Sequence, residues 1–221
     1  IYLYSNAFIQ GWRADLNVMR DRPAEYLAKF AGYNVLPKAI MWGLASGAVL
    51  GRRKVIEQIR YFHTTVGTLL PPFSVYLVLR GIKTAALRMR RQNENTERIA
   101  RFLESHPRVR QVFYPALESH PDHDTATRLM TGFGGVVSFR LKSKSLRESE
   151  AFLNRLKLFR IAASLGGVES LAETAATMSY WDKTPAERKR LGITDDLVRL
   201  AIGIEDAEDL IADLDQALKR S

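Results

Sequence analysis

The 221-residue sequence contains no cysteine. Disulfide scaffolds, thiolate metal sites and cysteine nucleophiles all need that sulfur, so the sequence excludes them. Long apolar runs are also missing. The longest, residues 35–50, contains Pro37 and Lys38, whereas a membrane span needs about 18–20 uninterrupted apolar residues. We therefore expect no membrane span and, in the absence of a secretory signal pattern, a cytoplasmic protein. Because the chain begins with Ile1 rather than Met, we expect it to continue upstream.

The composition is that of a folded protein with a basic surface. Hydrophobic residues make up 46% and charged residues 26%, and the formal net charge is +9. This predicts one or two globular domains. The basic excess gathers in one stretch that also has helical apolar spacing: Arg88, Arg90, Arg91, Arg98, Arg101, Arg108 and Arg110. A nucleic-acid site is the alternative, but no aromatic residues interleave as stacking would require, so we favour a solvated amphipathic helix and expect no nucleic-acid partner.

Hydrophobic periodicity predicts strands that alternate with helices. Helices are expected over residues 54–62, over 73–106 with a possible kink at Gly81, and over 122–130, 145–156 and 206–219. Strands are expected over 109–114, 136–140, 159–162 and 197–204, with residues 46–51 as a buried strand or tight hairpin. This order favours an α/β or α+β domain in which a small antiparallel sheet is covered by helices.

Several residues could carry chemistry, and each has a plain structural interpretation. His120 and His123 have metal-ligand spacing, but Pro121 lies between them, so we interpret His106 and His120 as exposed turn residues and expect no metal site. The glycine-rich segment 132–135 precedes a strand, whereas a phosphate loop follows one, so a structural turn is favoured.

Residues 164–171 and Arg199 are left with two interpretations each. The first segment, Ser-Leu-Gly-Gly-Val-Glu-Ser-Leu, is either a plain turn or a loop whose glycines let the backbone approach a ligand. Arg199 stands between Val198 and Leu200 in a short apolar strand. It either lies on the solvated side of an edge strand or faces inward, where it needs a carboxylate or phosphate partner.

Residues 69–221 closely resemble the C-terminal part of the Cys/Met-metabolism family of pyridoxal-phosphate (PLP) enzymes, which includes cystathionine γ-synthase and the cystathionine and methionine lyases. The stretches that carry the resemblance, in order along the chain, are 80–84, 112–115, 132–139, 164–171, 197–200 and 203–206. Residues 178–182, Met-Ser-Tyr-Trp-Asp, look most like the cystathionine γ-synthase branch. The resemblance implies an α/β protein of the fold-type I PLP-dependent transferases: residues 69–221 form the C-terminal domain, and 1–68 are a partial, diverged remnant of the large PLP-binding domain.

The resemblance also implies roles for individual residues. Ser164 and Arg199 match the hydroxyl and the arginine that hold the substrate α-carboxylate, a task suited to the bidentate guanidinium fork. Glu169 and Ser170 match the same motif without an assigned role. Ser5 stands where relatives carry the aspartate that bonds the pyridinium nitrogen, and a neutral hydroxyl would weaken the electron sink.

The lysine that binds PLP as a Schiff base has two possible alignments. One places Lys29 at that position, as a catalytic and cofactor-binding residue; the other places Glu25 there, which would abolish the linkage. The resemblance implies a cystathionine γ-synthase-like enzyme that uses PLP and a small amino-acid substrate in transsulfuration and methionine biosynthesis. A γ- or β-eliminating lyase and a non-catalytic remnant stay open. We expect a homo-oligomer, dimer or tetramer, or pairing with a chain that supplies the missing N-terminal half.

Overall fold

The computed structural model describes residues 51–67 and 69–219. Their contacts divide them into two compact units, one that reaches Ala86 and one that begins at Leu87. The boundary that the sequence suggests, at residue 68, stays a prediction, and the segment 46–51 lies almost wholly outside the described residues. In the described part, no helix is both long and apolar enough to cross a membrane.

The first unit contributes two helices to the described residues. Helix α4 (Arg53–Val66) ends at Gly67, whose left-handed backbone (φ 74°) lets its N–H bond to His63 O at 3.0 Å. Helix α5 (Pro72–Ile82) begins with proline in its first turn, where the missing N–H costs nothing. The predicted long helix is therefore two helices. The break lies at Lys83 and Thr84, two residues beyond the glycine at which a kink was expected.

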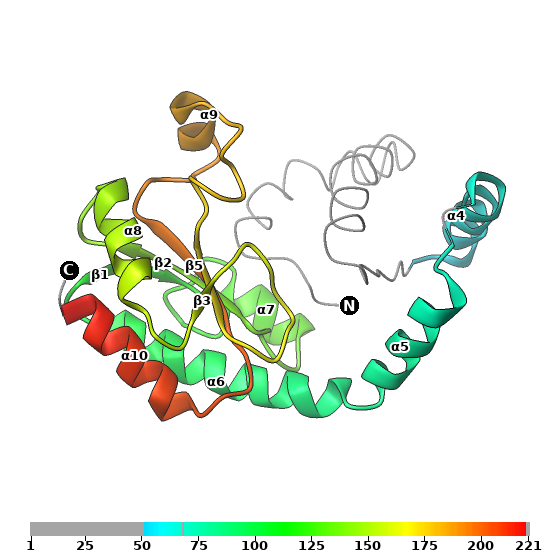
Figure 1. The fold of residues 1–221 in the computed structure, drawn as a ribbon, viewed down its shortest axis with the longest axis horizontal. Coiled ribbons are helices and arrows are strands. Elements are labelled where there is room, and N and C mark those ends of the chain that lie inside the picture. Colours follow the sequence, from blue (N-terminus) through cyan, green and yellow to red (C-terminus); the bar gives the residue numbers. More distant parts are fainter. Residues whose placement is uncertain (1–50, 68, 220–221) are drawn as a thin grey trace. The chain divides into compact units, whose positions relative to one another are not determined.

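The second unit is built on a five-stranded sheet in the order β1-β2-β5-β4-β3 (Figure 1). The strands are β1 (Val109–Phe113), β2 (Val136–Leu141), β3 (Arg160–Ile161), β4 (Leu171–Thr174) and β5 (Leu197–Ala201). All neighbouring strands are antiparallel except β3 and β4, which are parallel. The predicted small sheet is confirmed, with β5 at its centre.

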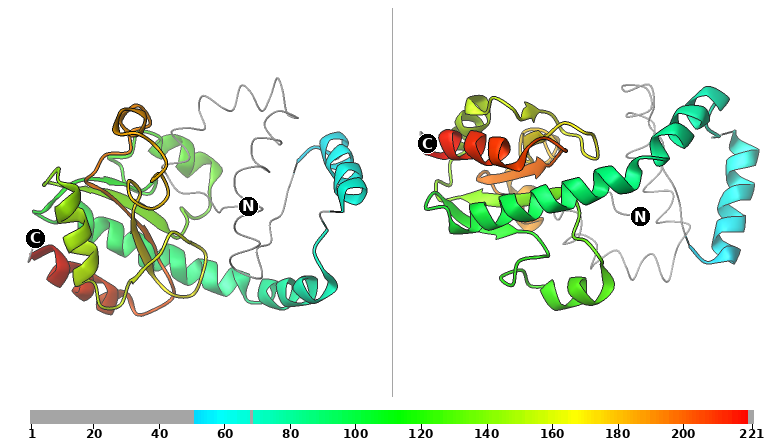
Figure 2. Two further views of the ribbon diagram at one scale, coloured as in Figure 1. Left: turned by 45° about the horizontal axis from the view of Figure 1, so that its top comes forward. Right: turned by 90° about the horizontal axis from the view of Figure 1, so that it is seen from below.

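Three helices cover one face of this sheet: α6 (Ala85–Ser105), α8 (Leu146–Arg155) and α10 (Ala207–Lys219). Figure 2 shows α6 and α10 running along the same side of the strands. The apolar side chains at alternate strand positions, such as Val137, Phe139, Val198 and Leu200, form the core with these helices. Strand alternation then leaves Ser138 and Arg199 on the second face, which places the polar residues away from the core.

Two short helices complete the unit. Helix α7 (His123–Leu129) follows β1, as the sequence predicts. Helix α9 (Pro185–Arg190) was not predicted. A capping box starts it, in which Thr184 Oγ1 accepts from Glu187 N and Glu187 Oε2 accepts from Thr184 N. Strand β4 was not predicted either: its first residue, Leu171, was assigned to the loop 164–171, and the residues after it were given no element.

Candidate functional site

A row of polar side chains crosses the middle of the second sheet face. Glu173 of β4, Arg199 of β5 and Ser138 of β2 are neighbours in register, since Arg199 is the Cα partner of both others. Directly opposed residues on adjacent strands have side chains on the same face. All three are largely buried, so this polar row is a built feature of the sheet rather than a solvated edge.

Arg199 lies at the centre of the polar row. Its strand is central, not an edge strand, and its side chain is only 11% exposed. The interpretation as a solvated edge arginine is therefore wrong, and the inward-facing alternative with a carboxylate partner is confirmed. That partner is Glu173, whose Oε1 lies 2.9 Å from Nη1 of Arg199. Nη2 of Arg199 donates to the carbonyl oxygen of Ser164 at 3.0 Å, and Nε is buried without a hydrogen-bond partner among the described residues.

Burial and charge oppose each other around this guanidinium. Removal from water lowers the pKa of Arg199 because burial disfavours the charged form, while the neighbouring carboxylate of Glu173 and the phenol of Tyr180 act to raise it. Burial raises the pKa of Tyr180, as does Glu173, and the charge of Arg199 opposes that rise. Arginine still stays protonated at any ordinary pH. The polar row therefore holds a permanent cation close to a buried carboxylate.

The loop before β4 brings Ser164 to this cation. Gly166 has a left-handed backbone (φ 80°), which a side chain would strain, and Gln92 of α6 donates its Nε2 to the carbonyl oxygen of Gly167 at 2.6 Å. Ser164 is exposed and its hydroxyl has no hydrogen-bond partner among the described residues. The two residues predicted to bind substrate are thus brought together through the backbone carbonyl of Ser164. Whether they bind substrate remains a prediction.

The end of the same loop is locked to the chain after β5. Ser170 is fully buried, and its Oγ donates to Glu205 Oε2 at 2.9 Å and accepts from Gly203 N at 2.9 Å. Ser170 N donates to Glu205 Oε1 at 2.6 Å. A Cβ on Gly203 would come within 2.1 Å of Val168 O, so only glycine fits there. These contacts give Ser170 a structural role that the sequence could not assign, while Glu169 stays exposed.

The glycine-rich segment 132–135 is a structural turn, as predicted. Gly134 N donates to Asn93 Oδ1 at 2.5 Å, and its carbonyl oxygen accepts from Tyr114 OH at 3.0 Å. Gly134 has a φ of 88°, so glycine is needed for the turn itself.

The histidines do not behave as the sequence suggested. His106 and His120 were interpreted as exposed, and both are buried. Each closes a turn at a His-Pro step, because its Nδ1 accepts a backbone N–H from two residues ahead: Arg108 at 3.2 Å and Asp122 at 3.1 Å. The following proline cannot donate, which leaves that next N–H as the donor. Among the described residues, no group of three possible metal-binding side chains occurs.

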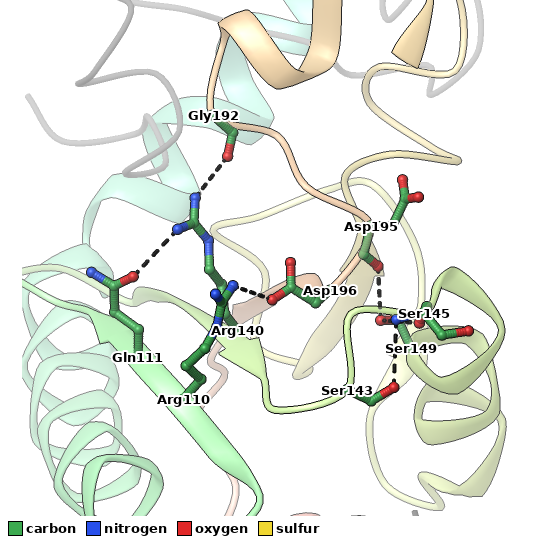
Figure 3. A network of polar contacts seen from close by, with 9 residues as sticks. All are labelled: Arg110, Gln111, Arg140, Ser143, Ser145, Ser149, Gly192, Asp195 and Asp196. Carbon is green, nitrogen blue, oxygen red and sulfur yellow. Dashed lines mark hydrogen bonds and ion pairs between the residues drawn. The ribbon is translucent and has the colours of Figure 1, made fainter. Parts of the chain in front are cut away.

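A second polar network lies at the end of the sheet near α8 (Figure 3). Arg110 of β1 pairs with Asp196, the residue before β5, and Arg140 of β2 donates to Gln111 Oε1 at 3.3 Å and to Gly192 O at 3.0 Å. Ser149 Oγ of α8 donates to Asp195 O at 2.8 Å. The bond between Arg140 and Gln111 joins β2 to β1, and each of the others ties a strand or helix to the chain that leads into β5. The network therefore anchors that chain.

The basic stretch lies largely on the surface of α6 and beyond its end. Within the described residues, five of its arginines form ion pairs with carboxylates: Arg91 with Asp206, Arg98 with Glu208, Arg101 with Glu97, Arg108 with Glu148 and Arg110 with Asp196. Two of these pairs link α6 to the segment that begins α10. The amphipathic-helix interpretation is confirmed for residues 85–105.

The residues predicted to contact the cofactor cannot be placed. Lys29, its alternative Glu25, and Ser5 all lie outside the described residues. The described part of the chain therefore informs only the substrate end of the expected site. There, a guanidinium with an unpartnered buried N–H and a free hydroxyl nearby is a donor set suited to a carboxylate.

Sequence reasoning missed Glu173. It lies in an apolar run, Leu-Ala-Glu-Thr-Ala-Ala (171–176), that directly follows the loop motif. A single acid within such a run must find a cation or hydrogen-bond donors if the run is buried. That signal, taken together with Arg199 in an equally apolar strand, would have predicted the pair.

Comparison with known proteins gives a consistent result. Residues 40–219 match the sequence pattern of the family described as Cys/Met metabolism PLP-dependent enzyme. The chain is 46% identical over 173 residues to cystathionine gamma-synthase 1, chloroplastic, of Nicotiana tabacum, which covers 78% of this chain and 32% of the relative. It is 47% identical to cystathionine beta-lyase of Coxiella burnetii (77% and 44% covered) and 45% identical to cystathionine gamma-lyase of Bos taurus (81% and 44%).

The chain thus spans less than half the length of these relatives. The match nonetheless includes all the described residues of the second unit, with β4, β5 and the loop that carries Ser164. The expected α/β fold of the fold-type I class agrees with the mixed sheet covered by helices. This chain belongs to the family of Cys/Met metabolism PLP-dependent enzymes.

Proposed function

We propose that the protein is a PLP-dependent transsulfuration enzyme that acts as a cystathionine γ-synthase does, replacing the γ-substituent of an O-acylated homoserine with cysteine. The observation that carries this proposal is the arrangement of Arg199 beside Ser164, because it offers an anchor for the α-carboxylate that every such substrate carries. The similarity to a cystathionine gamma-synthase supports it. Similarity of the same degree to two lyases makes elimination the alternative outcome.

In this proposal, the chain's own residues bind and orient the substrate. The guanidinium of Arg199 receives the α-carboxylate, with charge-assisted hydrogen bonds that fix both its position and its plane. The exposed hydroxyl of Ser164 donates a further hydrogen bond to the same group. Such anchoring aligns the reacting carbons before any bond changes, which removes much of the entropic barrier. Lys29 would hold PLP and move protons at Cα and Cβ, and PLP would supply the electron sink for carbanion chemistry.

The test is a product assay with the purified protein and added PLP. Given O-acylhomoserine and cysteine, the protein should form cystathionine and release the acyl group as its acid. Formation of 2-oxobutyrate or pyruvate from cystathionine, without the replacement reaction, would assign a lyase instead. A protein that neither binds PLP, by the visible absorbance of the bound cofactor, nor forms any of these products would be a non-catalytic member. Lys29→Ala is the matched control and should abolish both signals.

We further propose that the protein assembles, either with a second copy of itself or with a chain that supplies the missing N-terminal half. Large apolar side chains are exposed on α4 and α5, among them Tyr61, Phe62, Phe73 and Tyr76. Contiguous exposed apolar residues mark interaction surfaces more often than they serve a monomer. Sedimentation of the purified protein should give the mass of an oligomer, and Phe73→Asp should lower that mass; a monomer would reject the proposal.

A further inference from the structure

Glu173 is a buried carboxylate for which the proposed function has no use. It is 1% exposed and lies directly opposite Arg199 on the adjacent antiparallel strand. Its Oε1 forms an ion pair with Nη1 of Arg199 at 2.9 Å, and Ser179 Oγ lies 2.9 Å from both carboxylate oxygens, so that the hydroxyl can donate to either. The carboxylate is thus held in place from two sides.

Stability alone does not explain this residue. Burial of an ion pair removes two charges from water, and apolar residues of similar size in their place are often equally or more stabilising. The positions around the pair show that apolar packing was possible, since Leu171 and Ala175 on the same segment are buried. A buried pair at this position therefore calls for a role in what Arg199 does.

The donor count of Arg199 indicates that role. A guanidinium has five N–H donors in one rigid plane. Glu173 pairs with Nη1, and the Ser164 carbonyl oxygen accepts from Nη2, so two different nitrogens are held and the plane cannot turn freely. Among the described residues Nε is buried without a hydrogen-bond partner, and Nη1 and Nη2 each carry a second N–H. The two restraints thus fix the fork while they leave donors for one incoming carboxylate.

We propose that Glu173 is a positioning residue that fixes the guanidinium plane of Arg199 for the substrate carboxylate. The proposal rests on the proposed function, in which Arg199 is the carboxylate anchor. It makes a prediction opposite to that of simple charge balance. Loss of a neighbouring negative charge would by itself strengthen the attraction of Arg199 for an anion, whereas loss of a positioning contact weakens binding because the fork must be ordered at each binding event.

Two substitutions separate contact from charge. Glu173→Gln removes the charge and leaves only an amide oxygen opposite Nη1, whose uncharged contact holds the guanidinium more weakly. Glu173→Asp keeps the charge but draws the carboxylate back by one methylene, away from Nη1. Positioning predicts weaker carboxylate binding in both variants, while charge balance predicts tighter binding in E173Q and no change in E173D. If E173Q does not fold, E173D alone decides between the two, since it leaves Arg199 with a counter-charge.

The measurement is a ligand titration of the full 221-residue chain, monitored by NMR through the ¹⁵N–¹H signals of the Arg199 side chain. These signals are assigned by their absence from the spectrum of R199K. The probes are L-homoserine, which carries the α-carboxylate, and L-homoserine amide, which lacks it. In the unsubstituted chain, homoserine should shift these signals and the amide should not. Both Glu173 variants should raise the dissociation constant for homoserine about tenfold, because the charged contact that holds the guanidinium is lost or lengthened and such a contact is comparable to one hydrogen bond. They should also merge the separate Nη signals that a fixed plane gives.

Asp196→Asn is the matched control, because it breaks the other buried carboxylate–arginine pair next to β5. It should lower the unfolding temperature and leave the homoserine titration unchanged. Homoserine binding as tight in E173Q and E173D as in the unsubstituted chain, or tighter, overturns the role of Glu173 and leaves Arg199 as the anchor. Equal shifts with homoserine and its amide, or none with either, in the unsubstituted chain overturn the anchor itself, and the role of Glu173 with it.

Discussion

Two arginine–carboxylate pairs involve the central strand β5 or the residue before it, and they differ in burial and in what surrounds them. In the pair of Arg199 and Glu173, both side chains are buried, at 11% and 1% exposed, and the residues face each other in the sheet register. In the pair of Arg110 and Asp196, the carboxylate is 2% exposed but the arginine is 39% exposed. Arg110 keeps much of its hydration, so the desolvation penalty of its pair is smaller than that of the Arg199 pair.

The surroundings of the two pairs point the same way. Besides the pair itself, hydrogen bonds from β2 and α8 hold the segment around Asp196 (Figure 3), and each of these serves the path of the chain. The guanidinium of Arg199 meets an exposed serine loop and keeps an unpartnered N–H. We infer that one pair holds the fold together and that the other maintains a binding group.

The largest effect that separates the pairs should come from arginine-to-lysine substitution. Arg199→Lys keeps the charge but loses the planar fork, so the carboxylate of the substrate can no longer be bound in bidentate fashion. We expect kcat/KM for the γ-replacement reaction to fall about a hundredfold, which corresponds to about 2.7 kcal/mol. Arg110→Lys should leave kcat/KM unchanged. Steady-state kinetics of both variants make the test, and equal losses in the two would erase the distinction between the pairs.

A somewhat smaller effect, on stability, should follow from a methyl group at Gly203. Its Cβ would lie 2.1 Å from Val168 O and 2.3 Å from Glu205 Oε2, and the backbone oxygen cannot move without shifting the loop that carries Ser164. We expect Gly203→Ala to lower the free energy of unfolding by about 1–3 kcal/mol, measured by urea denaturation. Because the strain falls on the loop next to Arg199, the homoserine titration should weaken as well.

Gly81→Ala is the control for that substitution. A Cβ at Gly81 would meet nothing within 4 Å, and alanine favours the α5 helix over glycine by about 1 kcal/mol. The chain should be unchanged or slightly more stable. If both substitutions destabilised the protein equally, the close approach of Val168 O to Gly203 would not be the reason that position 203 requires glycine.

A several-fold effect is expected from Ser164→Ala. The contact between Ser164 and Arg199 uses the backbone carbonyl, which alanine retains, so the ion pair and the fold should be unaffected. Only the hydroxyl is lost, and a single hydrogen bond is worth about 0.5–1.5 kcal/mol, or about two- to tenfold in affinity. The homoserine titration measures this loss at unchanged unfolding temperature. A variant that binds homoserine as the unsubstituted chain does would remove the hydroxyl from the site.

The same comparison shows what the sequence could reveal. Helices 145–156 and 206–219 and strands 109–114, 136–140 and 197–204 were predicted close to their observed bounds, because their apolar spacing matches the geometry of each element. Strand β4 was missed because all four of its residues are buried, so the alternation that marks a strand is absent.

Only part of the candidate site was predicted from the sequence, for a related reason. The residues at 164 and 199 were found through a family motif, but the position of Arg199 on a central strand depends on strand order, which no local pattern encodes. Glu173 needed that order as well, since it becomes the neighbour of Arg199 only through the pairing of β4 with β5. Long-range pairing is thus the part of the site that sequence periodicity could not supply.

The smallest effect concerns pH, and it should affect the fold without affecting either pair. Burial lowers the pKa of His106 below its usual 6.5, although Asp215 opposes the shift, and burial likewise lowers the pKa of His120. Each Nδ1 accepts a backbone N–H, a bond that protonation would break. The unfolded chain therefore binds these protons more readily than the folded one. Stability is fully present above pH 6.5 and decreases as the pH falls below that value.

Asparagine at both positions is the substitution that tests this linkage. Its side-chain oxygen can accept the same N–H from two residues ahead, as in an Asx turn, but it does not titrate. In urea denaturation between neutral and mildly acidic pH, the His106→Asn, His120→Asn double variant should lose less stability than the unsubstituted chain does. Because Arg199 and Arg110 stay charged throughout this range, the Arg199 side-chain signals should not move with pH in either protein. An identical loss in both would show that other groups, not these histidines, make the fold sensitive to acid.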